Sequence, residues 1–558
     1  MLVRVSFSIE DISCLECLSN ELFYEIFEYL DGCDLIQSFS QLNRRLENLI
    51  QYSSLPLAVT FTSKSRTKLE ENCRNVIVPY KHRIRSLHLY DYSVIRNFFR
   101  TCTINDSFTC LESIVISDIS LENTIAALFF FKSLPRLSSL TIKLYDGYGE
   151  DGSNIFKFAL SLPTLKYLNI SISLDESYIE IPMTINSKPS SIERMILNGN
   201  LKISDLIAII QHAPKLKHIS CDELVTNDDE STQDESPVLK ELTYLSIKRF
   251  EADFDEFEYL MKRISSQLQI LHLKVLPFRS FLFENRWRQL INKHMPVLHK
   301  FHFDCFTGEY DFDYDYGHPV PELFKAFTSS FWTDRNWYVQ VTDTSDGHEF
   351  CIHSADPEKS NIQLKISEYD ANSWYNGYLE KAKPIYEAIE FTHLSIDCTD
   401  LLPNLMIEIL HLLPQLTSLE VISLPPIYSD DLCLSFAESE MLFSIGVHSK
   451  ITKMKIRQTK TIDFLMNFCP RIQYLEIEYS QDTDLEKIVG CIAVNNRTHI
   501  CYLDHLCLDK VTDTKKTCET LERCIDFERL LDSSKTSFNE YILEEKNKQI
   551  LLTWQLPR

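Results

Sequence analysis

Four metal-binding side chains lie close together near the end of the sequence: His499, Cys501, His505 and Cys507. Zinc sites in proteins are built from such nitrogen and sulfur ligands. However, Leu503, Leu506 and Leu508 already explain this stretch as a strand, and neighbouring residues of a strand point to opposite faces. One metal ion could therefore not easily collect all four ligands. Cys14 and Cys17 form a lone C-x-x-C pair, which is a weak metal signal without a second pair.

Four acidic residues are spaced like the ligands of a calcium-binding loop: Asp311, Asp313, Asp315 and Glu322. Such a loop needs glycine at its sixth position, where this sequence has Tyr316, and no clear helices flank it. A solvated acidic loop is the simpler interpretation. The sequence also contains no phosphate-binding glycine loop, nucleophile elbow or histidine-metal motif. We therefore predict that the chain is not an enzyme, and we assign no catalytic residue, metal or cofactor.

The composition indicates an acidic globular protein, for which a basic protein surface is a better electrostatic match than nucleic acid. The chain has 558 residues and a formal net charge of -24, so its field repels nucleic acid. Its 17 cysteines are scattered, mostly in apolar runs, unlike those of short disulfide-rich secreted domains. We see no signal peptide, and no apolar run is long enough to cross a bilayer. A cytoplasmic or nuclear protein without nucleic-acid or membrane partners is expected.

Residues 18–50 read as three short helices. Ser19 is a good helix cap, and apolar residues follow it at helical spacing: Leu22, Phe23, Ile26, Phe27 and Leu30. Asp31-Gly32 is expected to end this helix, because glycine tolerates the left-handed conformation of a helix end. Leu35 and Phe39 mark a second helix, and a third carries apolar residues at Leu42, Leu46 and Leu49, with Arg44 and Arg45 exposed.

The apolar stripe of the first helix is wider than one small core needs. With Tyr29 included it covers roughly 160° of the helix circumference. Burying each such side chain contributes about 1.5–3 kcal/mol, so leaving five of them in water would forgo roughly 8–15 kcal/mol. A segment this short cannot cover the stripe alone. Either the following domain or a partner protein must do so.

These residues resemble the F-box. The similarity lies in Leu18-Ser19-Asn20-Glu21-Leu22, then Ile26-Phe27, Leu30-Asp31, Asp34-Leu35 and Leu42-Asn43-Arg44-Arg45-Leu46. Ser19 stands where proline is common, and Leu46 where an aromatic residue is common. The resemblance implies docking to a Skp-type adaptor, and through it to a cullin, by these side chains: Leu18, Leu22, Ile26, Phe27, Leu30, Leu35, Leu42 and Leu46. The sequence cannot divide them between adaptor contact and internal packing, and an ordinary helical cap on a repeat domain is the alternative.

An apolar-x-x-apolar-x-apolar pattern recurs from residue 84 onward. Its copies begin at Ile84, Leu111, Leu137, Leu165, Ile192, Leu216, Leu242, Leu268 and Leu298, and then at Phe391, Leu416, Ile451, Ile472 and Leu503. Each copy predicts a short strand, and stretches such as 203–211 predict the helix that follows. One such unit cannot bury its apolar face alone, so neighbouring units must stack into a continuous core.

This repeat predicts an α/β fold: a curved solenoid with inner parallel strands and outer helices. The pattern resembles leucine-rich repeats of the irregular kind found in F-box leucine-rich proteins. In each strand, the residue between the last two apolar positions points away from the core. We expect such residues on the concave binding face: His88, Thr141, Asn169, Ser220, Ser246, His272, His302, Glu420 and Glu476.

Residues 307–390 break the period and are rich in aromatic residues. Residues 337–341, 350–353 and 362–366 look like strands, with a turn at Ser345-Asp346-Gly347. The region is an insertion or a set of degenerate repeats, and its aromatic residues either form an interface or fill a wider core. The expected organisation is an F-box at 12–52, solenoid at 53–306 and 391–532, the irregular region between them, and a tail or helix at 533–558.

The sequence therefore predicts the substrate-recognition subunit of an SCF-type ubiquitin ligase, which would hold a target protein near a ubiquitin-loaded enzyme. The identity of the target is open. The first alternative is a leucine-rich-repeat scaffold without a role in ubiquitin-dependent degradation. The second is an enzyme within 307–390, which would require a deep pocket with convergent polar groups there.

Overall fold

The computed structural model describes the following residues: 18–52, 55–62, 66–144, 153–172, 189–226, 239–276, 279–308, 320–344, 347–354, 362–367, 378–398, 401–423, 436–457, 462, 465–466, 469–480, 483–497, 503–531, 541–546 and 548–554. The chain forms two compact units. Unit 1 comprises Met1–His272 and Leu290–Leu298, and unit 2 comprises Leu273–Gln289 and His299–Arg558.

Unit 1 begins with three helices: α1 (Asn20–Glu28), α2 (Gly32–Phe39) and α3 (Arg44–Tyr52). The Ser19 hydroxyl caps α1 by accepting from the Leu22 N–H, as the sequence predicts. The Asp31 carboxylate caps α2, and Asn43 accepts from the Leu46 N–H at the start of α3. All three helix starts therefore use a polar side chain to satisfy a backbone N–H that lacks a partner within the helix.

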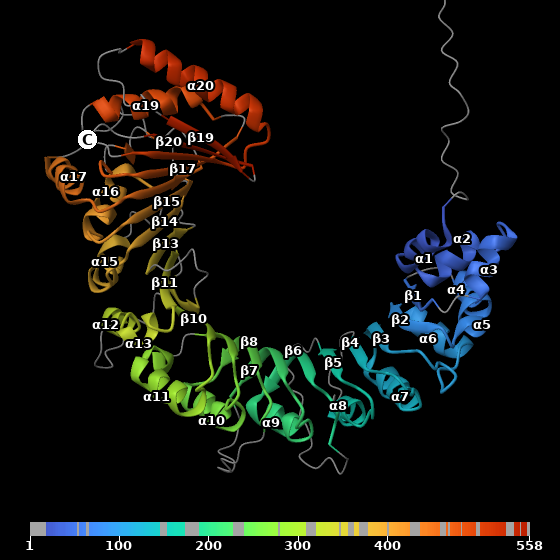
Figure 1. Ribbon diagram of the computed structural model, residues 1–558. Coiled ribbons are helices and arrows are strands. Elements are labelled where there is room, and N and C mark those ends of the chain that lie inside the picture. Colours follow the sequence, from blue (N-terminus) through green and yellow to red (C-terminus); the bar gives the residue numbers. More distant parts are fainter. Residues whose placement is uncertain are drawn as a thin grey trace, which may run out of the picture. The chain divides into compact units, whose positions relative to one another are not determined.

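The sheet of unit 1 consists of parallel strands. They are β1 (Leu57–Phe61), β2 (Ile84–Tyr90), β3 (Ser113–Ile119), β4 (Ser139–Leu144), β5 (Tyr167–Ser171), β6 (Arg194–Lys202), β7 (His218–Val225) and β8 (Tyr244–Glu251), each paired with the next. The connections carry α4 (Arg66–Asn72), a π-helix (Cys73–Ile77), α5 (Val78–Tyr80), α6 (Tyr92–Thr101), α7 (Leu121–Phe131), α8 (Ser153–Leu160), α9 (Ile203–Gln211) and α10 (Phe254–Ile264). Figure 1 shows these helices on one side of the sheet. We call the other side the open face.

Unit 2 continues the strand-and-helix alternation but contains antiparallel strands. Its sheet runs in the order β10 (Lys300–Gly308), β12 (Gly347–Ser354), β11 (Trp337–Thr344), β13 (Gln363–Ser367), β14 (His393–Asp397), β15 (Ser418–Ser423), β16 (Lys453–Ile456), β17 (Tyr474–Glu478), β18 (His505–Asp509), β20 (Gln549–Trp554) and β19 (Tyr541–Lys546). Strands β13–β18 are parallel, whereas β12 and β20 run antiparallel to their neighbours.

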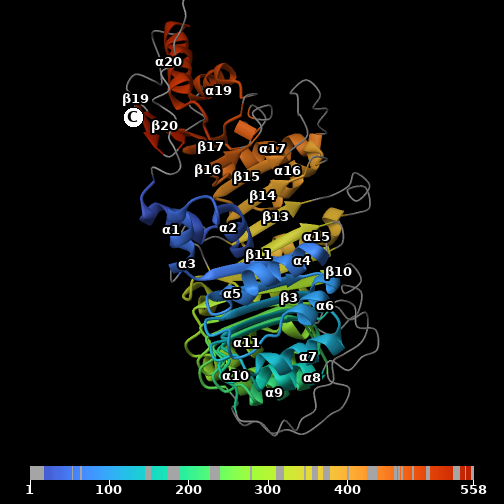
Figure 2. The ribbon, with the colours of Figure 1, turned by 90° about the vertical axis from the view of Figure 1, so that its right-hand side faces the viewer.

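The helices of unit 2 are η4 (Arg279–Leu282), α12 (Val320–Ala326), α13 (Ser330–Thr333), α15 (Tyr378–Ala388), α16 (Pro403–Leu412), α17 (Phe436–His448), α19 (Leu485–Arg497) and α20 (Thr514–Leu531). The chain passes between the units within β9 (Ile270–Val275), within α11 (Glu284–His294) and between Leu298 and His299. Figure 2 shows the parallel strands of each unit stacked side by side. The α/β class predicted from the sequence is therefore confirmed.

The repeated apolar residues form the core of both units. Every apolar position of the 14 sequence copies is buried, and Leu298, at 7% exposed, is the most accessible of them. In β5 the burial alternates residue by residue, with Leu168 and Ile170 buried and Asn169 half-buried. Helix α9 spans the residues that the sequence predicts, Ile203–Gln211. The period of the apolar pattern is thus the physical basis of the stacking.

The prediction that Gly32 ends the first helix is wrong. Helix α1 ends at Glu28, and Gly32 is the first residue of α2. Glycine is needed there because β1 passes close by: a Cβ atom on Gly32 would lie 3.1 Å from Val59 Cγ2 and 3.2 Å from the Ala58 carbonyl oxygen. Leu42, expected on the third helix, precedes α3.

Two further predictions need correction. The C-terminal residues form the antiparallel hairpin β19–β20 instead of a tail or helix, because alternating Ile550 and Leu552 bury one face of β20 beside β18. The apolar pattern has no copy at β1, at β11–β13 or at the hairpin β19–β20, although the strands β11–β13 were expected on other grounds. Strand β1 precedes the first copy, and β13 has Asn361 where the pattern needs an apolar residue.

The strands expected in the irregular region are confirmed as β11, β12 and β13. Its described aromatic residues act mainly as core: Trp332, Trp337 and Phe350 are each at most 1% exposed. The turn residues Ser345 and Asp346 lie outside the described residues, as do the other aromatic candidates: Tyr310, Phe312, Tyr314, Tyr316, Trp374 and Tyr375. Among the residues described, no helix is long and apolar enough to cross a membrane.

Candidate functional site

Helix α1 has two different apolar faces. Phe23 and Phe27 are buried, at 0% and 2% exposed. Leu22 and Tyr29 lie on the adjacent side of the helix and are 44% and 91% exposed. Ile26, one turn after Leu22, is half-buried. The wide apolar stripe expected from the sequence therefore divides into a side that packs into the core of unit 1 and a side that faces outward.

The eight predicted adaptor-binding residues divide in the same way. The buried ones are Phe27, Leu35 and Leu46, the exposed ones are Leu22 and Leu42, and the half-buried ones are Leu18, Ile26 and Leu30. The Phe27 ring contacts Phe23 and Phe39, with ring centroids 5.7 Å and 5.2 Å apart. Phe27, Leu35 and Leu46 are thus internal, and the outward apolar side of α1 carries Leu22 and Ile26, with Tyr29 at the end of the helix. We call these three residues the helix-α1 face; Leu42, which is also exposed, lies before α3.

The sheet holds the three helices in place through Asp31. Its carboxylate accepts from the Thr60 N–H of β1 at 2.6 Å and from the Cys33 N–H at 2.8 Å. Arg83 adds a second link, because its buried guanidinium donates to the carbonyl oxygens of Leu55 at 3.1 Å and Ile50 at 2.5 Å. The helices are therefore part of unit 1 and not a loosely attached module.

Arg45 fixes the start of α1. Its guanidinium donates to the Leu18 carbonyl oxygen at 2.7 Å and to Asn20 Oδ1 at 2.7 Å, and lies 5.4 Å from the Phe23 ring centroid. The sequence placed Arg44 and Arg45 together on an exposed surface. The structure gives Arg45 a positioning role, since it orders the first turn of the helix that carries Leu22 and Ile26.

The nine residues predicted for the binding face are all half-buried or exposed. They are His88, Thr141, Asn169, Ser220, Ser246 and His272 in unit 1, and His302, Glu420 and Glu476 in unit 2. Each alternates with buried apolar residues of its strand. They therefore lie on the open faces, as the strand alternation requires. Whether they bind a target is a separate question.

The open face of unit 1 also carries a row of side chains with ring contacts, of which only His272 is among the residues expected from the sequence. The Arg194 guanidinium carbon lies 5.7 Å from the Tyr167 ring centroid, and the His218 and Tyr244 rings stack with centroids 3.9 Å apart. The Tyr244 ring is 5.5 Å from that of His272. Tyr167, His218 and Tyr244 stand two positions before the selected Asn169, Ser220 and Ser246, so the same alternation could have found them.

The open face of unit 2 carries paired charges. Lys455 Nζ lies 2.8 Å from Glu476, and Glu478 lies 2.8 Å from Arg457 and 2.7 Å from Lys510. The hydrogen bond from Lys510 is the main cause that holds the pKa of the Glu478 carboxyl below its usual range. These groups already satisfy one another across neighbouring strands.

Asp304, Glu349 and Cys351 bring three metal-ligand atoms within 4.8 Å of one another on β10 and β12. Lys274 lies 3.2 Å from Glu349, and His302 lies 3.2 Å from Asp304. Burial opposes ionisation of Asp304, but hydrogen bonds from His302 and Cys351 outweigh it and lower the pKa of this carboxyl. Burial also raises the pKa of the Cys351 thiol, which disfavours the thiolate that a metal needs. We interpret this cluster as a charge-balanced network.

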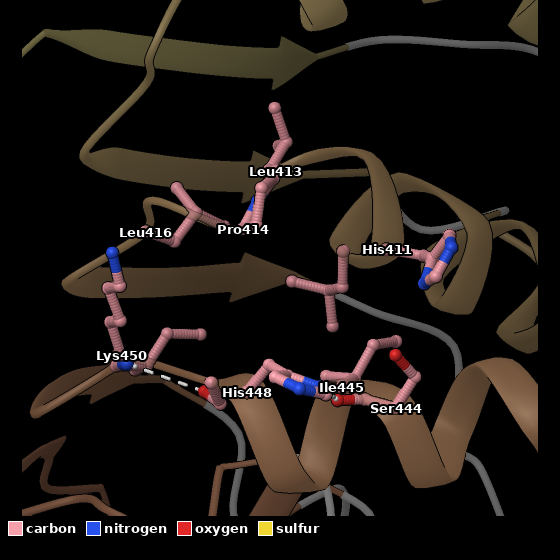
Figure 3. Close-up of a pocket in the computed structure, with 11 residues that line it drawn as sticks. His411, Leu413, Pro414, Leu416, Ser444, Ile445, His448 and Lys450 are labelled. Carbon is pink, nitrogen blue, oxygen red and sulfur yellow. Dashed lines mark hydrogen bonds between the residues drawn. The ribbon is translucent and has the colours of Figure 1, made fainter.

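A pocket of about 160 Å³ lies between the end of α16 and α17. Figure 3 shows it lined by Leu413, Leu416 and Ile445, with His448 and Lys450 at the rim. The two rim groups already have partners: His448 Nδ1 lies 2.9 Å from the Ser444 carbonyl oxygen, and Lys450 donates to Gln415 at 2.6 Å. No set of polar groups converges on the cavity, so it fits a gap between packed helices better than an active site.

The metal motifs weighed in the sequence lie partly outside the described residues. Those not described are Asp311, Asp313, Asp315, His499, Cys501, Cys14 and Cys17. His505 and Cys507 lie on β18, where the Cys507 thiol hydrogen-bonds Tyr474. This leaves the open faces and the helix-α1 face as the candidate sites.

Comparisons with known proteins do not assign this chain to a family. No family model matches the chain, and no curated protein matches it. A crystal structure of a protein from Bacteroides fragilis is 12% identical, aligns with 43% of this chain and 73% of its own, and has a TM-score of 0.21. That TM-score is too low to support an inference. The functional argument therefore depends on the residues of this chain alone.

Proposed function

We propose that this protein is a substrate-recognition subunit of an SCF-type ubiquitin ligase. In this proposal, helices α1–α3 are an F-box that docks on a Skp-type adaptor, and the strand-and-helix units are leucine-rich-type repeats that bind a target protein. The chain would bring the target near a ubiquitin-loaded enzyme and contribute no reacting group of its own.

The single observation that carries the proposal is the helix-α1 face. Leu22 and Tyr29 are 44% and 91% exposed, although Phe23 and Phe27 on the other side of the helix are covered, at 0% and 2%. Unit 1 thus has enough apolar surface to bury one side of α1 and leaves the other side in water. Exposed apolar side chains on an ordered helix are typical of a surface that a partner protein covers.

Co-purification of the full-length chain with a Skp-type adaptor tests the proposal. We expect the unmodified chain to retain the adaptor, and the double substitution Leu22→Asp plus Ile26→Asp to abolish retention. Two carboxylates at the centre of an apolar interface would have to lose their hydration without gaining a partner. Retention by the double variant, or no retention by the unmodified chain, would contradict the proposal.

A matched control uses exposed aromatic residues elsewhere in unit 1. Tyr92 on α6 and Phe129 on α7 are 45% and 70% exposed. Substituting both with Asp adds the same two charges at exposed ring positions away from α1, and should leave adaptor retention unchanged. Equal loss in the two double variants would indicate a general effect of surface charge.

The alternative is a repeat scaffold that binds proteins without a ligase. Its supporting observation is that α1–α3 are integral to unit 1, as a helical cap on a repeat domain would be. Proximity labelling with the intact chain and with the Leu22→Asp plus Ile26→Asp variant, after proteasome block, separates the two functions. A scaffold would show no adaptor and the same labelled proteins in both samples.

A further inference from the structure

We propose that the open face of β4–β7 in unit 1 binds an extended, carboxylate-rich segment of the target protein, with Arg194 and Lys143 as the anion-binding side chains. This inference rests on the proposed function, because it names the chemical class of target that the substrate-recognition subunit would take.

The first supporting observation is the composition of three adjacent strands. Strands β4, β5 and β6 contain no aspartate or glutamate. The whole chain has 80 acidic residues against 56 lysines and arginines, and a formal net charge of -24. A surface without carboxylates is therefore unusual for this protein, and it coincides with the strands that present Lys143 and Arg194.

The second observation is that nearby carboxylates already have cationic partners. Glu193 precedes Arg194 in the sequence, but its carboxylate lies 3.0 Å from Lys217 and 3.9 Å from Lys166. Asp222 on β7 lies 3.0 Å from Lys248. Asp222 shares the open side of β7 with His218 and Ser220, but its carboxylate is paired with Lys248, so the open face of β4–β6 remains without a carboxylate of its own.

Arg194 and Lys143 are both exposed, and in the part of the chain that the structure describes neither has a carboxylate within ion-pair distance. The Tyr167 ring supports the Arg194 guanidinium at 5.7 Å, which leaves the N–H groups at the edge of the guanidinium available. An arginine supported in this way is suited to bind a carboxylate through two parallel hydrogen bonds.

The spacing of the two cations fits an extended peptide. Lys143 on β4 is in register with Ser171 and, one strand further, with Asn198. Arg194 lies four residues before Asn198 on the same strand, so the two cations are roughly 16 Å apart along the surface. An extended chain covers that distance in about five residues, and its alternate side chains face the sheet.

The groups around the two cations supply hydrogen-bonding and stacking contacts. The Asn198 amide donates to Ser171 Oγ at 2.9 Å and to Asn169 Oδ1 at 3.4 Å, which orders the polar side chains between Lys143 and Arg194. On the other side of Arg194, the His218 and Tyr244 rings are nearly parallel, at 5°. They form a flat strip against which an apolar or planar side chain of the bound segment can pack.

Fluorescence anisotropy with the full-length chain tests this inference. The probe is a fluorescein-labelled 12-residue peptide of alternating glutamate and serine, compared with its glutamine–serine counterpart. We expect the glutamate peptide to bind and the glutamine peptide not to bind. Raising the salt from 0.1 to 0.5 M should weaken the binding, because the cations are exposed. Binding of both peptides, or of neither, would overturn the inference.

Charge reversal locates the site. Arg194→Glu should weaken binding of the glutamate peptide by at least about tenfold, and Lys143→Glu by several fold. The matched control is Lys157→Glu, which makes the same change at an exposed position on α8, on the helical side of the sheet. It should change affinity less than about twofold. Equal weakening in all three variants would indicate net charge and contradict a defined site.

A milder variant guards against misfolding. Arg194→Gln removes the charge with a side chain of similar length and should still lose most of the affinity, while circular dichroism melting stays within about 2 °C of the unmodified chain. Retained affinity in this variant would exclude Arg194 as an anion-binding residue. A further arm uses a phosphoserine peptide: binding of that peptide without binding of the glutamate peptide would refute the carboxylate specificity proposed.

The adaptor experiment on the same variants separates the two proposals. Arg194→Glu and Lys143→Glu should co-purify the Skp-type adaptor as the unmodified chain does, because both residues lie on the sheet, far along the chain from α1. If the unmodified chain binds the glutamate peptide but does not retain the adaptor, the ligase proposal is wrong and the acidic-segment site stands. If the unmodified chain retains the adaptor but does not bind the glutamate peptide, only the acidic-segment site is wrong.

Discussion

The open faces of the two units are built on the same scaffold and differ in what they leave available. In unit 1, strands β4–β6 have no carboxylates, and Arg194 rests on a tyrosine ring. In unit 2, the cations of β16 and β18 are paired with Glu476 and Glu478. Paired surface charges mostly satisfy one another, whereas an unpaired cation can take a ligand. The buried repeat positions therefore give both units the same scaffold, whereas the open-face residues between them differ in charge and in the ligands that they can bind.

If the two open faces lie on equivalent cores, truncating a buried leucine should cost a similar free energy of unfolding in each unit. Leu168 on β5 and Leu475 on β17 are both 0% exposed. We expect Leu168→Ala and Leu475→Ala each to lower the free energy of unfolding of its unit by about 2–5 kcal/mol. Chemical denaturation measures the loss. A cost below about 1 kcal/mol in either unit would show that its core is looser and would break the comparison.

The open-face neighbours of these leucines are the matched controls. Asn169→Ala in unit 1 and Glu476→Ala in unit 2 should each change the free energy of unfolding by no more than about 1 kcal/mol, because half-buried surface positions contribute little. A loss as large as that of the leucine variants would mean that the open faces are part of the core.

The pKa values of one histidine on each open face should be shifted in opposite directions. Burial, together with the nearby Arg194, lowers the pKa of His218 to about 4. The hydrogen bond to Asp304 raises the pKa of His302 above its usual value of about 6.5. Titration of the two ring signals by NMR, assigned with His218→Asn and His302→Asn, measures both. A His218 signal that titrates near 6.5 would contradict the packing of its ring against Tyr244.

The same shifts set the sign of two pH effects on stability. Because the folded-state pKa of His218 is depressed, unit 1 should lose stability as the pH falls from about 6.5 towards 4. Because the folded-state pKa of His302 is raised, its contribution to unit 2 is fully present below about 6.5 and is lost as the pH rises through the folded-state pKa. Denaturation across pH 4–8 measures the difference in free energy of unfolding between each histidine variant and the unmodified chain. Plotted against pH, this difference should have opposite slopes for the two variants.

The smallest effect concerns the paired charges of unit 2. Glu478→Gln leaves Arg457 and Lys510 without their carboxylate and should lower the free energy of unfolding by about 0.2–1 kcal/mol, with the loss shrinking at high salt. Arg194→Gln in unit 1 should cost less, since no carboxylate loses a partner there. A larger loss of free energy of unfolding for Arg194→Gln than for Glu478→Gln would show that the Arg194 charge, and not the paired charges of unit 2, contributes more to stability.

The amino-acid sequence alone predicted the α/β class and the buried positions of 14 strands, because alternate residues of a strand face the same side and repeats of regular length bury those sides by stacking. It also indicated which side of each strand avoids the core. Its apolar pattern is absent from β11–β13, for example at β13, where Asn361 interrupts the triplet. It did not anticipate that β12 lies between β10 and β11 or that β20 pairs with β18.

The half of the α1 stripe that stays exposed could not be predicted from the sequence, because it depends on contacts with later residues: the Phe27 ring contacts Phe39, and the Arg45 guanidinium lies 5.4 Å from the Phe23 ring centroid. The same holds for the rings beside Arg194: Tyr167 and Arg194 are 27 residues apart in sequence and meet only because β5 and β6 pair in one register. Local patterns encode the period and the faces of a strand, whereas contacts between strands depend on how distant segments align.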